Sequence, residues 1–202
     1  MRHAGGVHPR LLYFAHERLS PAELSAARLD GHLVELGEGY IPADAVETAG
    51  LRAASLLPVV DERLAATHTT AAWIHGALEE PPARHTVQRA VARRIHHVLD
   101  HRLAYRDACV EPRDLVRLGG VLVTTRARTL ADLTRLLASG DRSRSVRVAC
   151  RRLADRPGAP RSAIVCLAQQ DAVVGKPAAL AMLRRWERAA ERRQEDVTRY
   201  TS

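Results

Sequence analysis

Residues 119–133 read GGVLVTTRARTLADL and predict a tight turn, a strand and a helix in direct succession. The two glycines join the apolar runs 115–118 and 121–124, which is typical of a hairpin turn between short strands. Leucines recur at positions i, i+3 and i+7 over 125–137, so a helix with one apolar face is expected there. Thr125 can cap that helix. A helix that packs back onto strands belongs to the α+β class.

Outward from residues 119–133, the pattern predicts more helices on the C-terminal side and a mixture of elements on the N-terminal side. Helices are expected over 143–154, 161–170 and 176–194, followed by a frayed terminus at 196–202. Upstream, a helical segment is expected over 46–65 with a break or kink at Pro58, and a second helix over 71–78 with a cap in 67–70. Two β-rich runs follow, over 85–88 and 94–99.

The first 45 residues predict a module with the outline of a winged helix-turn-helix. A short helix is expected over 10–17, and Ser20-Pro21-Ala22-Glu23 is a capping box that starts a second, brief helix. Two apolar runs around Gly37-Glu38-Gly39 predict a hairpin, the wing, over 33–42. The outline is degenerate, because only residues 28–32 remain for a recognition helix and the wing is acidic. The module is either a DNA reader or a remnant used for packing or protein contact.

The expected fold class is therefore α+β, with a degenerate winged helix-turn-helix followed by a small mixed sheet with packed helices and a helical C-terminus. We place the first domain at 1–45, a basic α+β domain at 46–195 and the frayed terminus at 196–202. No internal repeat of 20–50 residues is visible in the sequence.

Charge is distributed unevenly along the chain. The sequence has 31 Arg and Lys residues, of which 30 are arginine, against 23 Asp and Glu. Residues 1–66 carry a net charge of −3, residues 67–202 carry +11, and residues 84–152 alone carry +10. Arginine in place of lysine is typical of GC-rich genomes, but the excess charge is not balanced by carboxylates. Attraction to a polyanion such as nucleic acid is therefore expected from the middle of the chain.

Composition argues against several classes of protein. Hydrophobic residues make up 46% of the 202 residues, which supports a folded core, and aromatic residues make up 3%, too few for a base-stacking surface. The three scattered cysteines form no C-x-x-C pair, which argues against a disulfide framework and structural zinc. No apolar window approaches 18 residues and the N-terminus has no apolar signal region, so we expect a cytoplasmic protein without a membrane partner.

No catalytic constellation is recognisable, and we expect no enzyme activity, no catalytic residues and no cofactor. Gly37-Glu38-Gly39 lacks the remaining glycines of a dinucleotide-binding loop, and Gly175-Lys176 lacks the other residues of a P-loop. His96 and His97 would point to opposite faces of a strand, so we expect no metal site from this histidine cluster.

Arginines are the best candidates for functional contacts. Arg89, Arg93 and Arg94 lie beside the expected strands, while Arg126 and Arg128 stand where the last strand meets its helix. Free N–H groups at a helix N-terminus attract anions, and two guanidinium groups beside one would strengthen phosphate binding. We predict these five arginines as DNA-phosphate contacts. The alternative is a solvated charged face that is paired in part with nearby carboxylates.

Several blocks of the sequence resemble the AbiEi-type antitoxins of type IV toxin–antitoxin systems, which act in abortive infection. These blocks are THTTAAWIHG at 67–76, PARHTV at 82–87, EPRDLV at 111–116 and, most strongly, 119–133, which is similar to a family signature GG-x-x-VTT-x-x-RT-x-x-DL. The resemblance covers about residues 10–140. Within the signature, Arg128 and Asp132 are four residues apart and can pair, so most of the motif describes a scaffold.

The resemblance implies a non-catalytic antitoxin that represses its own operon and opposes a nucleotidyltransferase-like toxin encoded beside it. In the family, the winged helix binds operator DNA with help from a basic C-terminal domain. A nuclease-like domain, which related chains often carry, is not implied here. Because the first domain of this chain is acidic, either the basic second domain makes most of the DNA contacts or DNA binding has been lost.

The function predicted from the sequence is a non-catalytic, antitoxin-like transcriptional regulator that binds operator DNA and opposes a nucleotidyltransferase-type toxin. One alternative is a protein-interaction module whose basic domain docks an acidic toxin surface. Another is an orphan regulator that has lost specific DNA binding. A homodimer would suit a regulator that reads a palindromic site.

Overall fold

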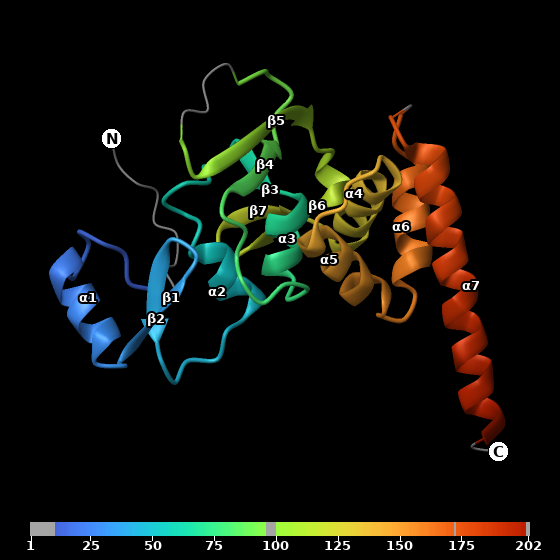
Figure 1. Cartoon of the computed structure of the whole chain (residues 1–202). Coiled ribbons are helices and arrows are strands. Elements are labelled where there is room, and N and C mark those ends of the chain that lie inside the picture. The colour runs from blue at the N-terminus through green and yellow to red at the C-terminus, as the bar shows by residue number, and fades with distance from the viewer. Residues whose placement is uncertain (1–10, 96–99, 172, 201–202) are drawn as a thin grey trace. The chain divides into compact units, whose positions relative to one another are not determined.

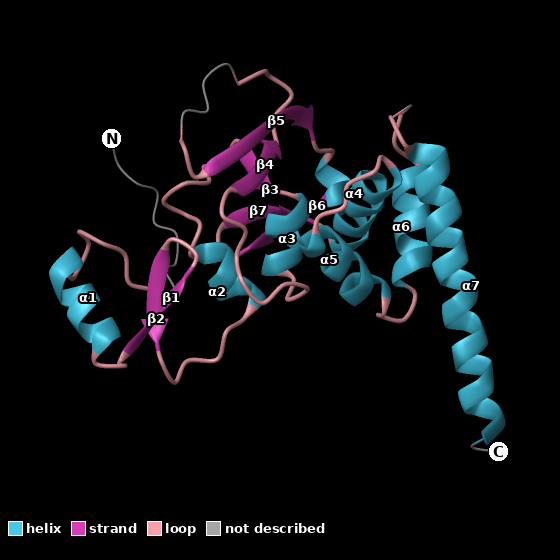
Figure 2. Cartoon of the chain, viewed as in Figure 1, coloured by secondary structure: helices cyan, strands magenta, loops and turns pink. Residues whose placement is uncertain are grey.

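The computed structural model describes residues 11–95, 100–171 and 173–200, and within these ranges the fold is α+β (Figures 1 and 2). This part contains seven α-helices, a mixed sheet of five strands and a two-stranded antiparallel sheet. The chain forms two compact units. Unit 1 consists of residues 1–66 and 83–123, and unit 2 of residues 67–82 and 124–202. The domain boundary expected at 45/46 stays a prediction, and both sides of it belong to unit 1.

The central sheet belongs to unit 1, apart from the last residue of its strand β7, and has the strand order β5-β4-β3-β7-β6. Its strands are β3 (Leu64–Ala66), β4 (His85–Arg89), β5 (Leu103–Cys109), β6 (Leu115–Leu118) and β7 (Val121–Thr124). Strand β3 pairs antiparallel with β4 and parallel with β7, while β4 pairs parallel with β5. The sheet is therefore mixed, as expected, and β4, β6 and β7 confirm three of the predicted strands.

The turn between β6 and β7 explains the glycine pair of residues 119–133. Gly119 has φ +51° and Gly120 has φ +90°, in the left-handed region that favours glycine. A Cβ atom on Gly119 would lie 2.1 Å from the carbonyl oxygen of Gly50 and 2.9 Å from the Cβ of Ala54. Both neighbours belong to helix α2 (Ala49–Ala54). The turn packs so closely on α2 that only glycine fits at position 119.

The start of unit 1 differs from the expected outline. Residues 11–17 form no helix, so the helix expected over 10–17 is wrong for the residues described there. Instead, Tyr13 and Tyr40 exchange two backbone hydrogen bonds of 2.9 Å. Leu12 and Phe14 are buried while Tyr13 is half-buried, which is the alternation of an extended strand. Burial against the hairpin therefore decides the local conformation.

The second helix and the hairpin of the N-terminal module are confirmed. Helix α1 (Pro21–Leu29) begins with the predicted capping box: the backbone N–H of Glu23 donates to Ser20 Oγ over 3.3 Å, and the Ser20 N–H donates to the Glu23 carboxylate over 2.8 Å. Strands β1 (Leu33–Leu36) and β2 (Gly39–Pro42) pair antiparallel. Residues 30–32 form a turn, and no helix lies there between α1 and β1. The described residues before the hairpin thus contain a single helix.

The acidic tip of the hairpin forms ionic contacts with other residues of unit 1. Glu38 lies at the tip, and its carboxylate contacts Arg102 Nη1 at 2.9 Å and His85 Nε2 at 3.3 Å. His85 begins β4 and Arg102 precedes β5, so these contacts tie the hairpin to the central sheet. Burial lowers the pKa of His85, against the opposing effect of Glu38.

Two expectations for the middle of the chain need correction. The segment 46–65 is helical only over α2 and continues through turns, which include Pro58, into β3. The β-rich run expected over 94–99 forms no strand at residues 94–95. Residues 96–99, with His96 and His97, lie outside the described residues.

Unit 2 is helical in the part of it that the structure describes. Its helices are α3 (His68–Ile74), α4 (Arg126–Ala138), α5 (Arg144–Ala154), α6 (Ala159–Ala168) and α7 (Lys176–Tyr200). Helix α4 packs against all four others, and Leu130 and Leu133 on it are buried. These helices confirm those expected from the sequence. Helix α7 continues past residue 194, so residues 196–200 extend it where we expected fraying, and residues 201–202 are not described. Within the described residues, no helix combines the length and apolarity needed to cross a membrane.

Candidate nucleic-acid interface

The threonines at the start of α4 form a buried hydrogen-bond network in unit 2. The N–H of Arg128 donates to Thr125 Oγ1 over 3.3 Å, which confirms Thr125 as the cap. Thr129 Oγ1 lies 2.8 Å from Thr124 Oγ1 and donates to the carbonyl oxygen of Thr125 over 2.9 Å. His75 Nε2 lies 2.7 Å from the carbonyl oxygen of Thr124. Because a carbonyl can only accept, Nε2 carries the proton of the neutral ring. Much of the motif is therefore structural.

Arg128 belongs to this structural part. Its Nε donates to Asp132 Oδ2 over 2.8 Å, and Arg135 Nη1 donates to the other carboxylate oxygen over 3.3 Å. The expected pairing of Arg128 with Asp132 is thus confirmed. Arg128 as a whole is only 7% exposed. A guanidinium that is buried on a carboxylate cannot reach a DNA phosphate, so we do not retain Arg128 among the proposed DNA contacts.

Arg126, two residues earlier, lies in a different environment. It is exposed and lines a cavity of about 420 Å³ together with Arg156, Leu153, Ala159 and other residues of unit 2. In the part of the chain that the structure describes, neither Arg126 nor Arg156 forms an ion pair with a carboxylate. Partial burial, and then the charge of Arg156, lower the pKa of Arg126. Two unpaired guanidinium groups therefore share one cavity.

Two helices begin at the same cavity. Arg126 and Ala127 are the first residues of α4, and Ala159 is the first residue of α6. The residue before α6 is Gly158, with φ +71°. Helix N-termini carry partial positive charge. The N–H of Arg128 already donates to Thr125 Oγ1 and that of Ala159 to the carbonyl oxygen of Arg156, so the two helix starts contribute mainly through this charge. The cavity thus combines two guanidinium groups with two helix N-termini, an arrangement suited to a phosphate group.

His75 lies in the same positive field. Burial lowers its pKa most, and the charges of Arg126 and Arg156 lower it further, whereas the hydrogen bond to Thr124 opposes the shift. The ring is therefore neutral at pH 7 and acts as a hydrogen-bond donor in the scaffold. Because His75 directly follows α3, its hydrogen bond to Thr124 joins α3 to the start of α4.

The other predicted arginines lie in unit 1. Arg89 Nε and Arg94 Nε approach the two carboxylate oxygens of Asp107 at 3.2 and 3.1 Å. Arg93 is exposed and makes no ion pair within the described residues. The single carboxylate of Asp107 therefore pairs with two of the three arginines, so the group as a whole keeps a net positive charge. The structure brings Arg89 and Arg94 together on Asp107. By contrast, Arg126 is exposed whereas Arg128 is buried, so these two do not form one contact surface.

Arg156 is a candidate contact that sequence reasoning missed. It follows the end of α5 in the sequence Arg156-Pro157-Gly158, which marks a turn but gives no sign of a ligand. It lies 30 residues after Arg126. Only the packing of α5 and α6 on α4 brings the two arginines to one cavity.

Unit 2 carries most of the chain's positive charge, with 17 Arg and Lys residues against 10 Asp and Glu. Among the residues that can be described, no group of three or more His, Cys, Asp or Glu side chains is placed to hold a metal ion. No model of a known protein family matches the sequence, and a search of the curated proteins gives no significant match.

Proposed function

We propose that this protein is a non-catalytic, antitoxin-like transcriptional regulator whose unit 2 binds the phosphate backbone of DNA. The observation that carries the proposal is the Arg126–Arg156 cavity. There, two guanidinium groups without a carboxylate partner in the described chain meet the N-termini of α4 and α6. Bringing these positive groups together raises the free energy of the unliganded protein, and a phosphate relieves the repulsion.

Contacts of this kind position a protein on DNA but do not read its sequence. Base contacts would come from the N-terminal module, which we propose as a degenerate winged helix. This module keeps α1 and a hairpin, but it has no helix over residues 11–17, and its acidic tip is engaged by Arg102 and His85. Unit 2 therefore supplies most of the affinity in the proposal, and Arg93 and Arg94 add contacts from unit 1.

The antitoxin part of the proposal is supported by the resemblance of residues 119–133. In the structure these residues form the close-packed β6–β7 turn, strand β7 and the first part of the capped helix α4. The start of α4 lines the Arg126–Arg156 cavity. The signature thus builds the scaffold that presents Arg126. A regulator of this kind acts in the cytoplasm and opposes a nucleotidyltransferase-type toxin.

The test is fluorescence anisotropy of the full chain on the DNA upstream of its own gene and on a scrambled duplex of equal composition. We expect tighter binding to the native duplex and a loss of affinity in the Arg126→Ala/Arg156→Ala variant. The matched control is Arg144→Ala/Arg188→Ala, which removes the same charge from exposed positions of unit 2 outside the cavity. Equal affinity for both duplexes would refute the regulator, because only a non-specific basic surface would then remain.

A further inference from the structure

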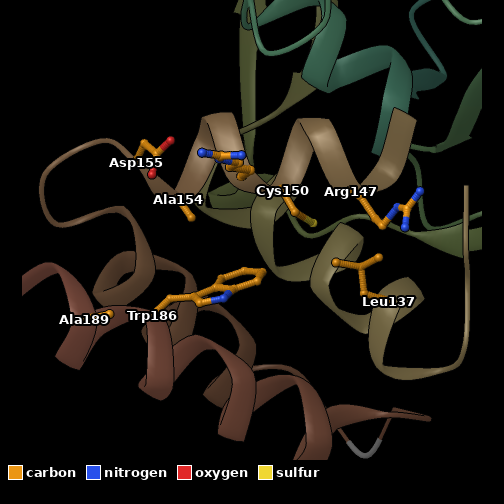
Figure 3. Close-up of a pocket in the computed structure, with 8 residues that line it drawn as sticks. Leu137, Arg147, Cys150, Ala154, Asp155, Trp186 and Ala189 are labelled. Carbon is orange, nitrogen blue, oxygen red and sulfur yellow. The ribbon is translucent and has the colours of Figure 1, made fainter. Parts of the chain in front are cut away.

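A second hollow of unit 2 lies between α5 and α7, at the C-terminal end of α4 (Figure 3). It consists of two adjoining pockets of about 390 and 500 Å³ that share Leu137, Arg147, Trp186 and Ala189. In Figure 3, the Trp186 ring points from α7 toward Cys150 on α5. We call this hollow the α5–α7 groove.

The floor of the α5–α7 groove is apolar and incompletely covered. Leu137, Met182 and Trp186 line it and are only partly buried, although each is a large hydrophobic residue. Helix α7 packs against α4 and α6, but its side toward α5 remains open and carries Trp186. Large aromatic side chains contribute most of the binding free energy at many protein interfaces when a partner buries them.

The rim of the groove is basic. Arg142, Arg147, Arg151 and Arg185 line it and are exposed, and none of them forms an ion pair with a described carboxylate. Two carboxylates, Asp141 and Asp155, belong to the same lining. By contrast, the neighbouring Arg152 does not line the groove and is paired with Glu79 at 2.6 Å. The rim therefore carries four exposed arginines and two carboxylates, which leaves an excess of positive charge around the apolar floor.

We propose that the α5–α7 groove binds an acidic amphipathic helix of a partner protein. An apolar floor accepts apolar side chains, and four arginines around it complement carboxylates on the flanks of the same helix. Helix α5 has 11 residues, which corresponds to a length of about 16 Å and to three turns of a partner helix. Three turns present anchors at positions i, i+3 or i+4, and i+7.

The other occupants fit less well. Nucleic acid would meet a floor of Leu137, Cys150 and Met182 with a single aromatic ring, whereas single-strand binders use several. Helix α7 of a second copy is itself rich in arginine and would repel the rim.

The groove is separate from the phosphate cavity. Both use the last turn of α5 and the residues after it, but Ala154 and Asp155 line the groove, whereas Leu153 and Arg156 line the cavity. The two linings share no residue, so a substitution in one leaves the lining of the other unchanged. The inference does not rest on DNA binding, so either proposal can fail without the other.

The test starts from a display library of 14-residue helical peptides that is selected on the full chain. Selected peptides are then titrated while tryptophan fluorescence is recorded. The chain has two tryptophans, and Trp73 is fully buried, so a change on binding reports Trp186. We expect enriched peptides to be acidic, with apolar residues at i, i+3 or i+4, and i+7, and to change the Trp186 signal.

Paired variants separate the two surfaces. We expect Arg147→Ala/Arg151→Ala to weaken the selected peptide at least tenfold, and Arg126→Ala/Arg156→Ala to leave its affinity within twofold. Both arginines of the first pair are exposed, so this variant keeps the fold even if Trp186→Ala does not. Enrichment of basic or neutral peptides, or binding that is indifferent to Arg147 and Arg151, would overturn the inference. So would a Trp186 response to duplex DNA, or a dimer of the free chain that Trp186→Ala dissociates.

Discussion

Replacing Asp132 with alanine removes the carboxylate on which Arg128 is buried. The Asp132 side chain is 1% exposed and that of Arg128 is 9% exposed, with 2.8 Å between Nε and Oδ2. Removing one partner of a buried ion pair lowers the free energy of unfolding by about 3–5 kcal/mol, because the remaining charge is left without compensation. We expect a loss of this size in Asp132→Ala.

Urea unfolding followed by tryptophan fluorescence measures this loss. Trp73 and Trp186 both belong to unit 2, so the signal reports the unit that contains the ion pair. With a urea dependence of about 2 kcal/mol per M, the unfolding midpoint should fall by roughly 2 M. The control is Glu79→Ala, which breaks an exposed ion pair and should lower the free energy of unfolding by less than about 1 kcal/mol.

A double variant checks the physical cause. Arg128→Met/Asp132→Leu removes both charges and fills the space with apolar side chains, so it should recover most of the stability. If Asp132→Ala shifted the midpoint no more than Glu79→Ala, the burial of this pair would be refuted. A double variant less stable than Asp132→Ala would refute the explanation by an uncompensated charge.

Three further predictions concern pH, backbone and thiol chemistry. Burial lowers the pKa of His75 below its ordinary value of 6.5 in the folded state, so the unfolded chain binds more protons below that pH. The contribution of His75 to the free energy of unfolding should therefore be fully present above pH 6.5 and be lost as the pH falls below it. Urea unfolding of His75→Gln should show a smaller loss of stability between these pH values, and a loss equal to that of the wild type would contradict this assignment. Gly119→Ala should lower the melting temperature more than Gly31→Ala, because both have positive φ but only position 119 lacks space for a Cβ; equal shifts in thermal circular dichroism would argue against the close turn. Iodoacetamide at pH 8 should modify exposed Cys109 and spare Cys150, whose pKa burial raises to about 12, and mass spectrometry showing equal rates would contradict that burial.

Sequence reasoning succeeded where the chemistry is local. The glycine pair, the Thr125 cap and the leucine period lie within residues 119–137, and they predicted β6, β7 and α4. Strand β3 escaped because all of its three residues, Leu64, Ala65 and Ala66, are buried, so no alternation is visible. It is identifiable only through its pairing with β4 and β7, which come later in the chain.

In the candidate site, too, features set by neighbouring residues in the sequence were predictable, whereas those set by tertiary packing were not. Arg126 could be selected because it stands at a helix start, but its neighbour Arg156 is brought there by tertiary packing. Arg128 could be paired with Asp132 from their spacing, whereas the burial that removes it from the surface could not be foreseen. The helices that carry Cys150 and Trp186 were expected from the sequence, but the sequence could not show that the groove between them stays open.

The salt dependence of DNA affinity tests the central claim most directly. Affinity of the wild-type chain and of Arg126→Ala/Arg156→Ala for the native duplex is measured by anisotropy from low to moderate salt. Each lost phosphate contact lowers the magnitude of the slope of log affinity against log salt by about 0.9. We predict a flatter slope in this variant and an unchanged slope in Arg144→Ala/Arg188→Ala. Equal slopes for the wild type and Arg126→Ala/Arg156→Ala would show that the cavity binds no DNA phosphate.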